Sequence, residues 1–163
     1  MLHSNVSKKL GFTLIESLIV VSIAGILIAM AIPSFIAAQN RAKLAQATDL
    51  VVASLQQAQQ EAIHRNQSCT LTLDKIDRKI LGQQGCLLSG DRNLPDAIDL
   101  DYTGGSGDIQ YGIRGNTTTN KSVVLVIRDS PTNTRCLTVS APLGIIRLGS
   151  YDLNSNTCRK FSS

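Results

Sequence analysis

The chain has 163 residues, of which 43% are hydrophobic and 17% are charged. That balance excludes a disordered chain, which combines low hydrophobicity with high charge. The length suits one domain with an appendage. The formal net charge is +4, and it is spread unevenly. Residues 66–108 contain seven acidic and four basic side chains, whereas residues 109–163 contain seven basic and two acidic ones.

A long apolar run lies near the N-terminus. Residues 12–32 carry one charge, Glu16, and closely follow the pair Lys8 and Lys9. As a helix this run would rise about 31 Å, close to the hydrocarbon thickness of a bilayer, and the lysines favour a cytoplasmic N-terminus. A secretory signal peptide with a cleavage site at 29–31 is the alternative. Glu16 argues against it, because a carboxylate deep in a bilayer costs roughly 2–4 kcal/mol and a discarded segment has no use for it.

Residues 8–16, Lys-Lys-Leu-Gly-Phe-Thr-Leu-Ile-Glu, resemble the processing site of type IV pilins and type II secretion pseudopilins. The resemblance implies that residues 1–11 are a leader peptide, that prepilin peptidase cleaves between Gly11 and Phe12, and that the new amine of Phe12 is methylated. It also implies that Glu16 pairs with the N-terminal ammonium of a neighbouring subunit. Two buried charges then neutralise each other only when subunits stack, which couples assembly to relief of desolvation.

Residues 12–33 are therefore expected to form a transmembrane and filament-core helix with two weak points. The weak points are Gly25 and Pro33. Glycine in a helix costs about 1 kcal/mol relative to alanine, and proline removes a backbone hydrogen bond. One alternative is a helix that ends at Pro33. The pilin resemblance implies instead a kink, with local melting between Gly25 and Pro33 inside the filament.

Residues 34–66 are predicted to continue the helix as an amphipathic segment. Apolar residues recur there at steps of three and four, which places them on one helical face: Leu44, Ala47, Val51, Leu55, Ala58 and Ala62. We expect this face to pack on a sheet. Asn66 and Gln67 are expected to mark the end of the helix.

Residues 67–163 are predicted to form a small β domain. Alternating or apolar segments, separated by turn residues, indicate strands at 69–73, 98–102, 109–113, 123–127, 135–140 and 145–151. A long helix followed by about seven strands gives an α+β fold. The helix is expected to pack on an antiparallel, sandwich-like domain.

Four cysteines lie in this domain: Cys69, Cys86, Cys136 and Cys158. None belongs to a Cys-x-x-Cys pair, which argues against a zinc site. Because the domain is expected outside the cytoplasm, the even number favours two disulfides, for which three connectivities exist. We expect local pairing, Cys69 with Cys86 and Cys136 with Cys158. The second bridge would resemble those that close the C-terminal region of many pilins.

The segment 136–149 resembles the C-terminal hairpin of the GspH/FimT-like minor pilins and pseudopilins, in which a β-sandwich follows the long helix. In some members a Gly-Arg-x-Arg run in this hairpin helps to bind DNA during natural transformation, and here only Gly144 and Arg147 match it. The basic excess of residues 109–163 keeps DNA binding as an alternative function. Its candidate phosphate contacts are Arg114, Lys121, Arg128, Arg135, Arg147, Arg159 and Lys160. The competing interpretation is ordinary solvated charge on both faces of the sandwich.

An enzyme is not expected, because the sequence lacks the nucleophile-elbow, phosphate-loop and zinc-protease motifs. A calcium site is an alternative for the acidic group Asp91, Asp96, Asp99, Asp101 and Asp108, although its spacing does not follow an EF-hand loop. We expect no cofactor and no metal.

The expected function is that of a structural minor pilin or pseudopilin subunit. Its expected partners are other pilin subunits, prepilin peptidase, the inner-membrane assembly platform and membrane lipid, with DNA under the alternative. The expected location is the bacterial inner membrane, crossed once, with the C-terminal domain in the periplasm. Assembly would then carry the subunit into a pilus or a periplasmic filament.

Overall fold

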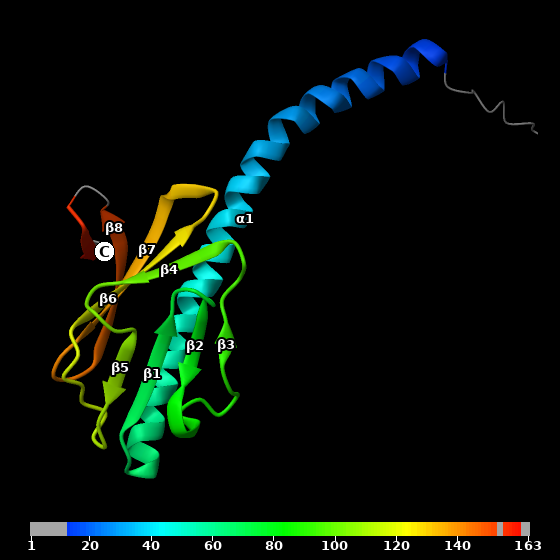
Figure 1. Cartoon of the computed structure of the whole chain (residues 1–163). Helices are drawn as coiled ribbons and strands as arrows, with labels where there is room; N and C mark the ends of the chain where they lie inside the picture. Colours follow the sequence, from blue (N-terminus) through cyan, green and yellow to red (C-terminus); the bar gives the residue numbers. More distant parts are fainter. Residues whose placement is uncertain (1–12, 153–154, 161–163) are drawn as a thin grey trace, which may run out of the picture. The chain divides into compact units, whose positions relative to one another are not determined.

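The computed structural model describes residues 13–152 and 155–160. Within these residues a single long helix, α1 (Leu14–Arg65), precedes nine β-strands (Figure 1). The expected leader peptide, with Gly11 and Phe12, lies outside the described residues. The chain divides into two compact units, residues up to 39 and residues from 40 onwards. Each unit is described by itself.

Helix α1 begins and ends at polar residues that satisfy its free backbone groups. The backbone N–H of Glu16 donates to Thr13 Oγ1 at 3.3 Å, which caps the first turn. At the other end, Asn66 has a positive φ of 52°, and the N–H of Gln67 donates to the carbonyl of Ala62 at 3.2 Å. That left-handed residue and backward hydrogen bond are the usual stop signal of a helix. The end expected at Asn66 is confirmed.

The helix does not end at Pro33. Residues on both sides of Pro33 belong to α1, so the alternative of a helix that stops there is wrong. The missing N–H of proline removes one hydrogen bond, and the neighbouring turns keep the segment helical. The kink and local melting stay predictions.

The predicted apolar face of the second unit is confirmed. All six apolar residues of the pattern are buried, and Thr48 and Ser54 are buried beside them. These two hydroxyls donate to the carbonyls of Leu44 and Leu50, four residues earlier, at 2.7 Å each. Their polar groups are therefore satisfied inside the helix, which lets them lie on a packed face.

The strands form two antiparallel sheets. The four-stranded sheet has the order β3 (Arg92–Asn93), β2 (Lys79–Gly82), β1 (Cys69–Asp74), β5 (Asp108–Tyr111). The five-stranded sheet has the order β4 (Ile98–Tyr102), β6 (Lys121–Ile127), β7 (Ser130–Ser140), β8 (Ile145–Asp152), β9 (Thr157–Lys160). A short 3₁₀ turn, η1 (Gln83–Gly85), follows β2.

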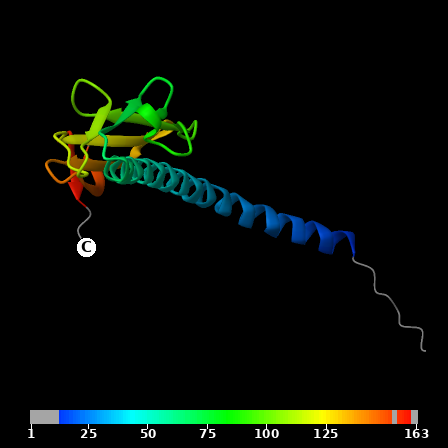
Figure 2. The same cartoon turned by 90° about the horizontal axis from the view of Figure 1, so that it is seen from below.

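One hydrophobic core joins the second half of α1 to both sheets. It contains Leu55 of the helix, Leu71 of β1 and Leu125 of β6, each fully buried. Strands β1 and β2 lie over this half of the helix in Figure 1, and Figure 2 shows it along one side of the strands. The α+β fold with a helix on a two-sheet domain is confirmed. The strand number is nine in the described residues rather than about seven, because β2, β3 and β9 are short strands at or near sheet edges.

Candidate assembly and interaction sites

The first unit presents an uncovered apolar surface. Every described residue up to 39 is exposed, including Leu14, Val21, Leu27 and Phe35 at between 63% and 82%. Within the described residues, α1 is the one helix long and apolar enough to cross a membrane, with a mean hydropathy of 2.5 over its most apolar window. A soluble monomer rarely leaves so long a run of apolar side chains uncovered. It requires lipid or other helices as a cover.

Glu16 lies in the first turn of α1 and is exposed. A carboxylate there interacts favourably with the positive end of the helix dipole. None of the ion pairs found among the described residues involves Glu16. Its charge is therefore available to a group from outside those residues.

Gly25 stands in open space within the isolated chain. A Cβ added at this position would meet no atom within 4 Å. Packing inside one molecule therefore does not require glycine here. The helix weakening that the pilin resemblance implies for Gly25 stays a prediction.

The candidate DNA contacts are divided between the two faces of the five-stranded sheet. Arg135 on β7 pairs across strands with the buried Leu125, so it lies on the core-facing side. Arg147 on β8 pairs with Thr138, which is three positions from Arg135 along β7. Because successive side chains alternate between faces, Arg147 lies on the opposite side of the sheet.

Two more of these arginines are engaged within the chain. Arg128 Nη2 lies 2.6 Å from Asp99 Oδ1, and Arg159 Nη2 lies 3.0 Å from Asp152 Oδ2. Arg114 is exposed in the connection after β5. The side chain of Lys160 lies outside what the structure describes.

Lys121 is buried rather than solvated, which corrects its place among the phosphate contacts. It is 6% exposed, and its ammonium donates to the backbone carbonyls of Ser106 and Asp108. Burial lowers the pKa of Lys121, and the nearby Asp108 carboxylate partly offsets that effect. The ammonium fixes the loop before β5 instead of facing solvent.

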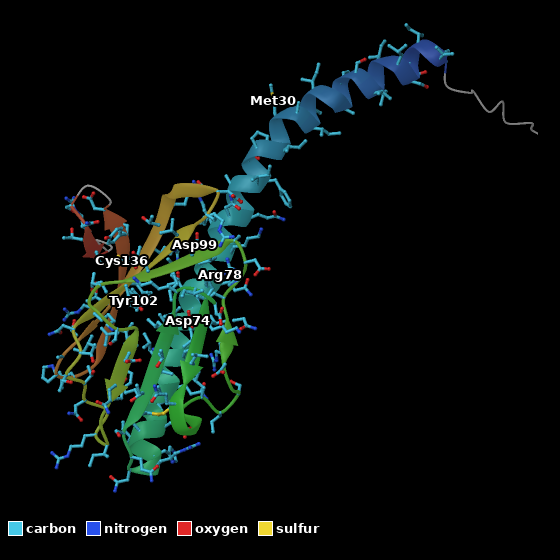
Figure 3. All side chains as sticks on the ribbon, viewed as in Figure 1. Met30, Asp74, Arg78, Asp99, Tyr102 and Cys136 are labelled. Carbon is cyan, nitrogen blue, oxygen red and sulfur yellow. A yellow bond between two sulfur atoms is a disulfide. The ribbon has the colours of Figure 1, made fainter. Side chains whose placement is uncertain are left out.

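A charged network surrounds β4 and the β1–β2 turn, as Figure 3 shows for Arg78 and Asp99. Asp99 accepts from Arg128 and lies 3.9 Å from Arg78 Nη1. The hydrogen bond from Arg128 holds the pKa of Asp99 below its ordinary value, against the opposing effect of partial burial. These carboxylate–guanidinium pairs are exposed and contribute little to stability.

Asp101 is likewise engaged. Burial opposes its ionisation, yet hydrogen bonds from Lys75 and from the backbone N–H of Tyr102 lower its pKa overall. Asp96 lies 3.7 Å from Arg78 Nη2, so three of the five acids proposed for calcium are paired with basic side chains. Over the described residues, no group of three or more His, Cys, Asp or Glu side chains is arranged to hold a metal ion.

The two disulfides join the pairs expected. Cys69 at the start of β1 bonds Cys86 after η1, with the Cα atoms 5.6 Å apart. Cys136 on β7 bonds Cys158 on β9, with the Cα atoms 5.8 Å apart. The second bridge crosses β8 and ties the last strand to the centre of the sheet.

A tether between the helix and two loops was not foreseen from the sequence. Gln59 Nε2 donates to the carbonyl of Gly115 at 2.8 Å and to that of Leu143 at 3.3 Å. These carbonyls lie 56 and 84 residues away in the chain, in the β5–β6 and β7–β8 connections. The N–H of Thr117 also donates to the carbonyl of Pro142 at 2.9 Å. The amide thus ties both connections to the last turns of α1, and the backbone bond ties the two connections to each other.

Gly144 allows this close approach. Its φ is +68°, and an added Cβ would lie 2.9 Å from Tyr111 Cε1 and 3.1 Å from both Gln59 Nε2 and the Gly115 carbonyl oxygen. The position therefore needs glycine for its backbone angle and for its space. Gly144 was singled out in the sequence as a member of a DNA-binding run. In the structure it is a packing residue.

Comparison with known proteins agrees with this architecture. A family model described as the type II transport protein GspH matches residues 47–143, more than half of the chain. The chain belongs to the GspH family. The matched segment of this GspH-family chain covers the second half of the helix and most of both sheets, up to the β7–β8 turn. A second model, the prokaryotic N-terminal methylation motif, matches residues 6–32.

Solved structures share the fold of this GspH-family chain. The minor pseudopilin EpsH from the type 2 secretion system of Vibrio cholerae superposes with a TM-score of 0.56 at 16% identity, over 66% of this chain and 97% of that one. The type IV minor pilin FimU of Pseudomonas aeruginosa superposes with a TM-score of 0.54 at 15% identity, over 75% and 97%. Among curated protein sequences none matches the chain. At these identities the likeness shows a shared fold.

Proposed function

We propose that the chain is a structural subunit, a minor pilin or pseudopilin, of a type IV pilus or a type II secretion filament. The observation that carries the proposal is the presence of two matches in one chain. A methylation motif covers residues 6–32, and a GspH domain follows at residues 47–143. The solved relatives by fold are a minor pseudopilin and a minor pilin. An exposed apolar helix joined to a folded domain is the design of a subunit that leaves a membrane for a helical assembly.

Processing is the first step of the proposed function. Prepilin peptidase cuts between Gly11 and Phe12 and methylates the new amine of Phe12. Residues 12–33 then hold the subunit in the bacterial inner membrane, with Lys8 and Lys9 on the cytoplasmic side before cleavage. Residues 67–163 fold in the periplasm, where an oxidising environment preserves both disulfides.

Glu16 supplies the coupling between membrane release and assembly. In lipid, an isolated carboxylate is costly, and so is an isolated ammonium. In the filament, Glu16 of one subunit meets the N-terminal ammonium of the next, which relieves both costs at one defined axial register. When the apolar helix moves from lipid into a helix bundle, its apolar side chains exchange one apolar surrounding for another and favour no particular axial position. The paired charges therefore set the axial register of the subunit.

Mass spectrometry of the mature polypeptide tests the processing step. The full-length chain is co-expressed with a prepilin peptidase, and a chain that begins at N-methylated Phe12 is expected. Gly11→Val blocks cleavage, because its side chain obstructs the peptidase, while Gly25→Ala is the control at an open position. A mature chain that begins beyond residue 31 identifies a secretory signal peptide and overturns the proposal.

Removal of one charge tests the assembly step. Glu16→Gln keeps the shape of the side chain, so processing continues and recovery in sheared filaments falls. Glu61→Gln is the matched control, because Glu61 lies on the same helix and pairs locally with Arg65 at 2.9 Å. Equal recovery of both variants in filaments would refute the role of Glu16.

The proposal does not extend to DNA binding. Arg135 and Arg147 lie on opposite faces of the sheet, and Arg128 and Arg159 are paired with carboxylates. A phosphate-contacting stripe requires unpaired basic groups on one face.

A further inference from the structure

Two basic residues follow the uncovered apolar part of α1. They are Arg41 and Lys43, which we call the basic pair, and both side chains are exposed. They come three positions and one position before Leu44, which is the first buried residue of the helix. The basic pair therefore stands where the exposed apolar surface has ended and the packed face of the domain begins.

The charges of the basic pair are not compensated by neighbouring side chains. Neither residue forms an ion pair among the residues that the structure describes. On a helix, a side chain reaches partners three or four positions away. At those positions around the basic pair the sequence has only alanine, leucine, glutamine and asparagine. Both charges are therefore available to an anionic group from outside the described residues.

The uncharged helix that precedes the basic pair is as long as a bilayer is thick. Residues 17–39 carry no charge, and all of them are helical and exposed. A helix of this length rises about 35 Å, slightly more than the hydrocarbon thickness of about 30 Å. A chain that crosses a membrane with this segment brings the residues that follow it, including the basic pair, to the level of the lipid headgroups.

Basic residues at this end of the membrane span need a favourable partner. Lysine and arginine are enriched on the cytoplasmic side of membrane spans, where Lys8 and Lys9 are expected. The basic pair lies at the other end of the span, next to the folded domain. Phosphate is a fitting partner there, because guanidinium and ammonium groups form charge-assisted hydrogen bonds with its oxygens.

The two side chains of the basic pair point to different sides of α1. Successive residues of an α-helix are turned by about 100°, so two residues that are two positions apart differ by about 200°. Long basic side chains extend along an apolar surface and place their charged ends at the headgroup level. Arg41 and Lys43 can therefore reach headgroups on two sides of the helix.

We propose that the basic pair binds the phosphate groups of anionic phospholipids in the leaflet next to the folded domain. The inference rests on the proposed function, because only a chain that crosses a membrane brings the basic pair to the headgroups. The bound phosphates fix the depth of the helix. Moving the helix outward by one turn, about 5.4 Å, draws both charges away from the phosphates. The subunit is thus held at one depth until assembly removes it from the membrane.

Photo-crosslinking of the full-length chain in lipid vesicles tests the contact. The vesicles contain equal amounts of phosphatidylglycerol, which is anionic, and phosphatidylcholine, which has no net charge. A benzophenone amino acid replaces Ala42, an exposed residue between Arg41 and Lys43. Mass spectrometry is expected to find about tenfold more crosslink to phosphatidylglycerol than to phosphatidylcholine. About 1 M salt is expected to remove most of this preference, because it screens the charges.

Removal of the two charges supplies the second arm. Arg41→Gln together with Lys43→Gln is expected to abolish the preference for phosphatidylglycerol. The matched control, Arg65→Gln with Arg114→Gln, removes two positive charges elsewhere and is expected to keep the preference. Arg65 is the last residue of α1, and Arg114 lies in a connection that contacts the last turns of the helix. All variants are compared as chains with both disulfides formed.

Several outcomes would overturn the proposal. They are equal crosslinking to both lipids, crosslinks only to another copy of the chain, and no crosslink at all. A preference that persists without the basic pair, or that disappears equally in the control, overturns it as well. Flotation of the chain with the vesicles is measured in parallel. A chain that floats without a lipid preference overturns this inference alone, whereas a chain that does not float contradicts the membrane span and with it the proposed function.

Discussion

Gly144→Ala is the substitution for which the structure makes its sharpest stability prediction. The methyl group would stand at a φ of +68°, 2.9 Å from Tyr111 Cε1 and 3.1 Å from Gln59 Nε2 and the Gly115 carbonyl oxygen. The left-handed backbone costs about 1–2 kcal/mol for a residue with a Cβ. The crowded contacts add about 1–3 kcal/mol, as in other overpacked sites.

The same domain provides a control that separates these two contributions. Gly90 has a φ of +75°, but a Cβ there would meet nothing within 4 Å. Gly90→Ala therefore carries the backbone strain without the crowding. Both substitutions also lower the conformational entropy of the unfolded chain, which raises the free energy of unfolding by about 0.4–1 kcal/mol in each variant. The free energy of unfolding is expected to fall by about 2–4 kcal/mol for Gly144→Ala and by about 1 kcal/mol or less for Gly90→Ala.

Urea unfolding of the full-length chain in detergent micelles, with both disulfides intact, measures the difference. The chain has no tryptophan, and its three tyrosines are Tyr102, Tyr111 and Tyr151, so tyrosine fluorescence reports only on the folded domain. Equal losses of stability in the two variants would mean that the hairpin tip is not packed against Tyr111 and Gln59. That result would refute the tether between Gln59 and the hairpin tip.

Three further predictions concern a buried phenol, an ion pair and a disulfide. Within the described residues, Tyr111 Oη is buried without a hydrogen-bond partner. Tyr111→Phe should therefore leave the free energy of unfolding unchanged or raise it by about 1 kcal/mol. A loss above about 1 kcal/mol would show that the hydroxyl has a hydrogen-bond partner in solution. Burial raises the pKa of Tyr111 to about 12; stability is therefore full below the ordinary tyrosine value near 10, falls as the pH rises toward 12, and should lose this dependence in Tyr111→Phe. Arg128→Ala should raise the pKa of Asp99 toward its ordinary value in an NMR titration. Because the pair lowers the pKa of Asp99 in the folded state, its contribution to stability is present at neutral pH and is lost as the pH falls through the folded pKa. An unchanged pKa of Asp99 in the variant would show that the pair is absent in solution. Replacing Cys136 and Cys158 by serine opens a loop closed over a separation of 22 residues, which should lower the free energy of unfolding by about 3–4 kcal/mol, against no change if the bridge is strained or unformed.

Hydrophobic periodicity was sufficient for the helix and for its buried face. Steps of three and four between apolar residues from Leu44 to Ala62 place them on one face of an α-helix, and all six residues are buried. The cysteine count and the expected location outside the cytoplasm predicted two disulfides but left three connectivities open, and the local pairing that we expected is the one observed. These signals are local or nearly so, which is why a single sequence carries them.

Other features depend on contacts that no local pattern records. Strands β2, β3 and β9 are two to four residues long, too short for a period of two to stand out. Lys121 alternates with the buried Val123 and Leu125, a signal for a core-facing position that its charge concealed. Gln59 gave no signal, because its two acceptors are backbone carbonyls far away in the chain.

The amide of Gln59 also has a mechanical meaning. It links the last turns of α1 to the tip of the β7–β8 hairpin, and β7 is bonded in turn to β9 through Cys136 and Cys158. Tension that reaches these last turns is therefore passed through the hairpin to the far edge of the five-stranded sheet. The hold on the helix therefore combines its buried apolar face with this one amide tether near its end.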